Sequence, residues 1–153
     1  METNLAIVGI LTLTAIKPDG SKRTVTCKNL ITKFGLSFLA ALVTDPLSHD
    51  FVNHIAVGTG TTAPTEDDTS LEAELVRAES TRKQLSGDYS NICQFQAVFG
   101  RGAATGDLTE AGIFDDVAAG NMFNRSVFTA FTVGPDEALL ADWRVSFQNV
   151  TTP

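Results

Sequence analysis

The sequence predicts a mainly β fold, an antiparallel β-sandwich with one main helix and one short helix packed on it. Three observations lead to this prediction. Apolar and polar residues alternate along much of the chain, as in half-buried strands. Clusters of glycine, proline and aspartate separate these runs. One stretch alone repeats its apolar residues every four positions at length, as a helix does. The 153 residues, 43% of them hydrophobic, suit a single domain with its own core.

The chain is predicted to open with a hairpin over about residues 5–28. The run LAIVGILTLTAI alternates in its second half, with Leu11 and Leu13 on one face. KPDG then supplies a turn, because Pro18 presets φ and Gly20 can take a positive φ. SKRTVTCKN returns as the second strand. No basic segment precedes the apolar opening, so we interpret it as a strand and not as a secretion signal.

The main helix is predicted between Asn29 and Pro46. Asn29 can cap its start, and TDP ends it. One apolar face is formed by residues that recur every four positions: Leu30, Phe34, Phe38 and Leu42.

A second, shorter helix is predicted from Thr69, because Thr69 and Glu72 fit the Thr-x-x-Glu capping box. The preceding acids, Glu66, Asp67 and Asp68, would then stand at a helix N-terminus, where the macrodipole favours negative charge.

The C-terminal half is predicted to form strands in NICQFQAVFG, LTEAGIFD, NMFNRSVFTAFTV and ALLADWRVSFQN. Each is bounded by turn residues, which brings the total to about seven strands. Their alternation and the helix pattern assign one shared core to Phe34, Phe38, Phe95, Phe99, Phe128, Trp143, Val145 and Phe147.

The stretch HIAVGTGTTAP, residues 54–64, raises the question of a phosphate cradle. A dinucleotide fingerprint needs a third glycine, and a P-loop needs a Gly-Lys-Ser/Thr ending. Neither is present, and the acids that follow would repel phosphate. We therefore interpret Ile55–Val57 as a strand that leaves through a glycine turn into a surface loop. A calcium site in the acids remains an alternative, although the spacing of an EF-hand is missing.

Candidate nucleophiles and bases are few. His49 and His54 are the only histidines, and Cys27 and Cys93 are the only cysteines. No nucleophile elbow or papain-like signature accompanies them. We interpret both cysteines as buried free thiols, although a Cys–His pair formed in space stays an alternative.

The carboxylates suggest structural roles. Glu110 lies in TEAGIF, where a lone acid is expected to be tied to a backbone amide or to an arginine such as Arg125. Asp115 and Asp116 precede VAAGN and are interpreted as turn formers. The sequence thus predicts no catalytic residue, no cofactor and no metal, and the chain is not expected to be an enzyme.

Charge narrows the partners. The net charge is −7, which argues against nucleic acid, whose binding needs clustered Lys and Arg. No apolar run reaches the length of a membrane span, so no membrane partner is expected. Basic residues gather only around Lys17 to Lys28.

Several segments together resemble a family of small structural proteins of tailed bacteriophages. NLITKFGLSFLAALV, VNHIAVGTGTTAPTEDDTSLEAELVR, GRGAATGDLTEAGIFDD, MFNRSVFTAFTV and ALLADWRVSF stand in the order typical of that family. An Asn-Leu-Ile-Thr helix, a VGTGTTAP loop and a TEAG(L/I)F strand recur there in one β-rich domain. The resemblance covers about residues 29–149 and implies a virion protein without catalytic residues.

The resemblance implies a head-decorating (cement) or surface subunit, made in the bacterial host cytoplasm, that docks on the major capsid protein or on tail proteins. The alternative is a tail-fibre or fibre-adaptor protein at the tail or baseplate, involved in host attachment. A homo-oligomer is expected in either case. We expect the contacts to come from the basic hairpin and the glycine loop, through Lys17, Lys22, Arg23, Lys28, Gly58, Thr59, Gly60, Thr61, Thr62 and Pro64.

Overall fold

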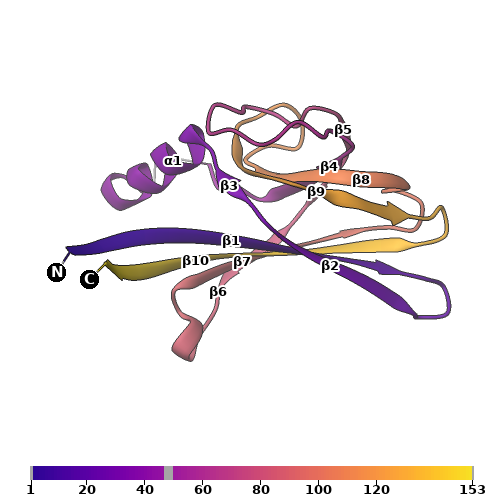
Figure 1. Cartoon of the computed structure of the whole chain (residues 1–153), viewed down its shortest axis with the longest axis horizontal. Coiled ribbons are helices and arrows are strands. Elements are labelled where there is room, and N and C mark those ends of the chain that lie inside the picture. Colours follow the sequence, from indigo (N-terminus) through magenta and orange to yellow (C-terminus); the bar gives the residue numbers. More distant parts are fainter. Residues whose placement is uncertain (1, 47–49, 153) are drawn as a thin grey trace.

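The computed structural model describes residues 2–46 and 50–152, and they form two facing antiparallel sheets (Figure 1). The first sheet runs β2 (Lys22–Lys28), β1 (Glu2–Ile16), β10 (Ala138–Thr152), β7 (Ile92–Phe99) and β6 (Thr81–Gln84). The second sheet runs β3 (Leu30–Ile31), β9 (Met122–Val133), β8 (Gly106–Phe114), β4 (His54–Gly58) and β5 (Glu74–Glu79). The predicted β-sandwich is confirmed.

The core lies between the inner faces of the two sheets. Leu11, Leu13 and Trp143 are fully buried there, which confirms the alternation predicted for β1 and β10. The other predicted core residues are either buried (Phe38, Phe95, Phe99, Val145) or half-buried and packed against this core (Phe34, Phe128, Phe147).

The main helix, α1 (Lys33–Thr44), packs its apolar face toward β9. The Phe38 ring meets the edge of Phe123, with centroids 6.2 Å apart. The helix ends before Pro46 as predicted, but its N-cap is Thr32, whose Oγ1 accepts a hydrogen bond from the Gly35 amide.

The predicted cap, Asn29, is wrong. The next two residues pair with β9 as strand β3, so the helix begins later. Asn29 Oδ1 instead accepts a hydrogen bond from the Trp143 indole at 2.7 Å.

The second predicted helix is also wrong. No helix begins at Thr69; the chain runs as a loop from Thr59 to Ala73 and enters β5 at Glu74. Besides α1, the described residues contain one short 3-10 turn, η1 (Gly87–Tyr89). The capping box failed because the Glu72 carboxylate binds loop amides and not the amide of a cap residue.

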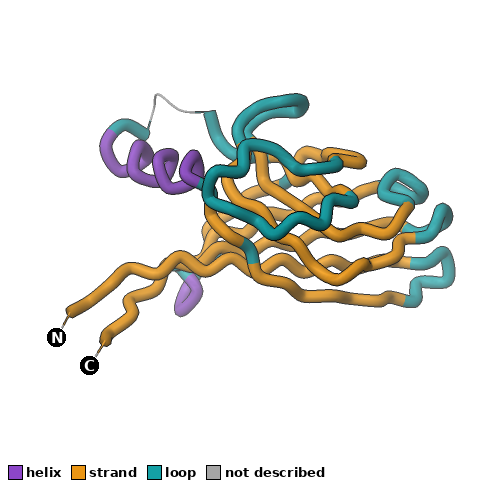
Figure 2. The backbone as a smooth tube through the Cα atoms, turned by 45° about the horizontal axis from the view of Figure 1, so that its top comes forward, coloured by secondary structure: helices purple, strands orange, loops and turns teal. Residues whose placement is uncertain are grey.

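The strands β1 and β10 pair along their whole length, from Glu2 with Thr152 to Ile16 with Ala138. Their neighbours are shorter. Strand β2 pairs with β1 only from Ile10 onward, and β7 pairs with β10 only as far as Ser146. Residues 2–8 and 148–152 therefore form a two-stranded extension, here called the terminal ribbon, which leaves the body of the sandwich with both chain ends (Figure 2).

Candidate docking site

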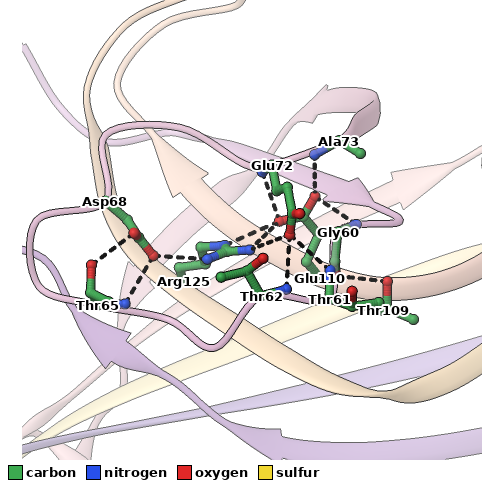
Figure 3. A network of polar contacts seen from close by, with 10 residues as sticks. All are labelled: Gly60, Thr61, Thr62, Thr65, Asp68, Glu72, Ala73, Thr109, Glu110 and Arg125. Carbon is green, nitrogen blue, oxygen red and sulfur yellow. Dashed lines mark hydrogen bonds and ion pairs between the residues drawn. The ribbon is translucent and has the colours of Figure 1, made fainter.

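The glycine loop, defined here as residues 58–73, is organised around one buried carboxylate. Glu110 on β8 is fully buried. Its Oε1 accepts hydrogen bonds from the amides of Gly60 at 2.9 Å and Ala73 at 2.7 Å, and its Oε2 accepts one from the Glu72 amide at 3.0 Å (Figure 3). Both ends of the loop are thus tied to a single side chain.

Arg125 on the neighbouring strand β9 balances this buried charge. Its Nη2 and Nε donate to Glu110 Oε2 at 2.9 and 3.1 Å, and its Nη1 donates to Asp68 Oδ2 at 2.8 Å. The arginine is 3% exposed, and buried charges persist in proteins when they are paired and hydrogen-bonded. The sequence-based expectation that Glu110 is tied to backbone amides or to Arg125 is confirmed in both forms.

A second carboxylate holds the outer part of the loop. Glu72 Oε2 accepts from the amides of Thr61 and Thr62 at 2.9 and 2.8 Å. These amide bonds, with that of Thr62 foremost, lower the pKa of Glu72. The Thr109 hydroxyl donates to the Gly60 carbonyl at 2.8 Å, which fixes the same segment from the other side.

The acids predicted to precede a helix have other partners. Asp68 accepts from the amide and hydroxyl of Thr65, and Lys33 at the start of α1 forms ion pairs with Glu66 and Asp67. Partial desolvation acts to raise the pKa of Asp68, but the bonds from Thr65 and Arg125 outweigh it and lower that pKa.

The two glycines of GTG provide space for these contacts. A Cβ added to Gly60 would lie 2.6 Å from Glu110 Oε1, and one added to Gly58 would lie 2.4 Å from the Ala73 carbonyl oxygen. The loop does cradle an anion with its amides, but that anion is the chain's own Glu110 carboxylate. The spacing that resembles a phosphate loop has a structural explanation.

The side chains at the top of the glycine loop face solvent. Thr59, Thr61 and Thr62 are exposed and Pro64 is half-buried, whereas Gly58 and Gly60 are buried. Of the loop residues expected at an interface, the threonines are therefore accessible, and the glycines serve to position them.

The basic hairpin is less free than its sequence indicates. Lys17, Lys22 and Lys28 are exposed. Arg23, by contrast, donates to Glu137 Oε2 at 2.8 Å and to the Thr132 carbonyl at 2.7 Å, and it lies over the Phe131 ring. Arg23 thus attaches β2 to the second sheet, which leaves three lysines for any partner. The hairpin belongs to the first sheet and the glycine loop to the second, so they lie on different layers.

The candidate nucleophiles are dispersed. Cys27 on β2 and Cys93 on β7 are half-buried free thiols, separated by β1 and β10 in the sheet order, and burial raises the pKa of each. His54 begins β4, and His49 lies outside the described residues. Asp115 accepts a hydrogen bond from the Asn121 amide within a turn, as expected.

Within residues 2–46 and 50–152, no group of three or more His, Cys, Asp or Glu side chains could hold a metal ion. None of the helices in this part of the chain is long and apolar enough to cross a membrane.

Sequence reasoning did not identify an apolar pocket of about 320 Å³ between α1 and the first sheet. Phe38, Leu42, Phe95 and Phe147 contribute to its lining. The guanidinium of Arg82 also contributes and lies over the ring of Phe51, 4.4 Å from its centroid. The pocket forms because the apolar helix face extends beyond the end of the packed core.

A scan against protein-family models found no matching family, and comparisons with curated proteins and with solved structures likewise found no match.

Proposed function

We propose that this chain is a non-enzymatic structural protein of a tailed-phage virion, which docks on neighbouring virion proteins as a head-decorating (cement) or surface subunit. The observation that carries the proposal is the glycine loop. Its amides are tied from within to Glu110 and Glu72, while Thr59, Thr61 and Thr62 are exposed. This is the loop that also carries part of the resemblance to phage structural proteins.

Pre-organisation is the physical reason why such a loop suits docking. Ordering a flexible loop at an interface costs free energy that would otherwise contribute to affinity. A loop already ordered by a buried ion pair avoids most of that cost. Its outward hydroxyl groups can then form hydrogen bonds with a neighbouring subunit without further rearrangement.

The alternative position is a tail-fibre or fibre-adaptor protein at the tail or baseplate. The terminal ribbon favours it, because an arm that extends from the body can reach a second chain at a distance. In both cases the partners are other virion proteins and further copies of this chain.

Fractionation of purified virions tests the proposal. Heads and tails would be separated and the chain quantified in each by mass spectrometry. We expect it in the head fraction at many copies per particle. Recovery in tails would favour the fibre-adaptor alternative, and absence from both fractions would contradict a virion role.

A further inference from the structure

The terminal ribbon leaves one edge of β1 without a partner. The last contact on that side is the hydrogen bond from the Asn29 amide to the Gly9 carbonyl. In an antiparallel strand the backbone groups of alternate residues point to the same side. The amides and carbonyls of Thr3, Leu5 and Ile7 therefore point outward like those of Gly9, and no strand among residues 2–46 and 50–152 pairs with them.

Every other outer edge in the described part of the two sheets is charged or very short. Natural sheets use charged edge residues and short edge strands to prevent pairing with other chains. The protected edges are β2 with Lys22, Arg23 and Lys28, β6 with Arg82 and Lys83, β5 with Glu74, Arg77 and Glu79, and the two-residue β3. Residues 3–8 carry no charge at all. This stretch of β1 is open to pairing where the other edges are not.

The side chains of this stretch are also incompletely covered. Leu5 is 67% exposed, although it lies on the same face of β1 as the half-buried Ile7 and the buried Leu11. A ribbon of two strands is marginally stable in water by itself, because it needs a third strand or a packed face. An added strand would supply both the missing backbone bonds and cover for Leu5.

We propose that the added strand is β1 of a second copy, paired antiparallel about a two-fold axis at Leu5. Leu5 then faces Leu5, and Thr3 of each copy faces Ile7 of the other. Each of these hydrogen-bonded pairs exchanges two backbone bonds. The two first sheets become one continuous sheet, with the Leu5 and Ile7 side chains of both copies on one face.

Charge and geometry select this occupant and this register. The chain carries a net charge of −7, so two copies approach with least repulsion along an uncharged segment. The register places residue 2 of one copy opposite residue 8 of the other, which keeps the two Glu2 positions at opposite ends. It is also the longest pairing that stops before Gly9, where Asn29 already covers the edge. A two-fold contact of this kind closes on itself and leads to a dimer and not to a fibre.

Cysteine cross-linking tests the register directly. In a chain with Cys27 and Cys93 changed to Ala, Leu5→Cys should oxidise to a disulfide-linked dimer, because facing Cα atoms in such a pair lie about 5.5 Å apart, within the range of a disulfide. Ile10→Cys is the matched control. It is 40% exposed but lies where β2 covers the edge, and it should remain a monomer under the same oxidant.

Sedimentation of the unmodified chain supplies an independent measurement. We expect a mass of twice 16.3 kDa. Leu5→Pro should give a monomer with an unchanged circular dichroism spectrum, because it removes an outward amide and leaves the bonds to β10 in place. If Leu5→Pro fails to fold, the cysteine pair still decides. A wild-type chain of 16.3 kDa at all concentrations, or equal cross-linking at positions 5 and 10, would overturn the proposal. The self-pairing does not rest on the virion role, so either result leaves the fractionation experiment unaffected.

Discussion

The glycine loop and the terminal ribbon satisfy their backbone in opposite ways. In the irregular loop, the carboxylates of Glu110 and Glu72 accept hydrogen bonds from five amides. In the regular ribbon, the outward groups of alternate β1 residues lack a partner strand among the described residues. Irregular backbone can thus be complete within one chain while a regular strand is not. The comparison indicates that the loop presents a finished surface and the ribbon an unfinished one.

Removing the central carboxylate should have the largest effect on this comparison. Glu110→Ala leaves Arg125 with Asp68 as its remaining close partner and deprives three amides of their acceptor. Breaking a buried ion pair costs about 3–5 kcal/mol, and the buried unpaired amides add to this. Urea unfolding should show the loss. Glu66→Ala, at a carboxylate that is 59% exposed, should change stability by less than about 0.5 kcal/mol, and equal behaviour of the two variants would refute the central role of Glu110.

Truncating Trp143 tests the strand that carries the ribbon. The side chain is fully buried and its indole donates to Asn29. Trp143→Ala should lower the free energy of unfolding by about 3–5 kcal/mol, the range for a large buried aromatic residue. Arg144→Ala, the next residue on the opposite face, serves as control. A melting temperature within a degree or two of wild type for Trp143→Ala would place that residue on an exposed face.

A single methyl group at the glycine loop should have a smaller effect. Gly60→Ala forces a Cβ to within 2.6 Å of Glu110 Oε1, and overpacking of this kind costs about 1–3 kcal/mol. Gly100→Ala is a matched control, because a Cβ there meets no atom within 4 Å. Thermal unfolding of both variants checks the expectation. If Gly60→Ala proved as stable as Gly100→Ala, the glycine would not be needed for close approach to the carboxylate.

Acid should loosen the loop by the smallest amount. The folded state lowers the pKa of Glu72 and of Asp68. Their stabilising contribution is therefore complete above their unfolded pKa values, 4.5 and 3.8, and is lost as the pH falls through the lower folded values. Unfolding free energies measured from pH 6 down to about pH 3 should decrease less steeply for Glu72→Gln than for wild type. Parallel curves would exclude a contribution from Glu72.

Local patterns predicted the regular parts of this fold well. The alternation around Leu11 and Trp143 identified the core, and the position of Glu110 in TEAGIF anticipated its partner Arg125. The capping box at Thr69 failed because the Glu72 carboxylate gained more from distant loop amides than from a local cap. The open edge at Leu5 could not be predicted, because it depends on where β2 stops relative to β1. That relation is set by the three-dimensional pairing of the strands.

The most direct measurement of docking through the finished surface is the occupancy of particles that lack this chain. Thr61→Lys with Thr62→Lys would place two bulky charges on the exposed threonines without removing the amides bound to Glu72. Thr129→Lys, an exposed threonine on β9, is the control. Bound copies would be counted by cryo-microscopy at equal protein concentration. We expect the loop variant to lose most of its occupancy while the control binds like wild type. Wild-type occupancy by the loop variant would contradict docking through the glycine loop.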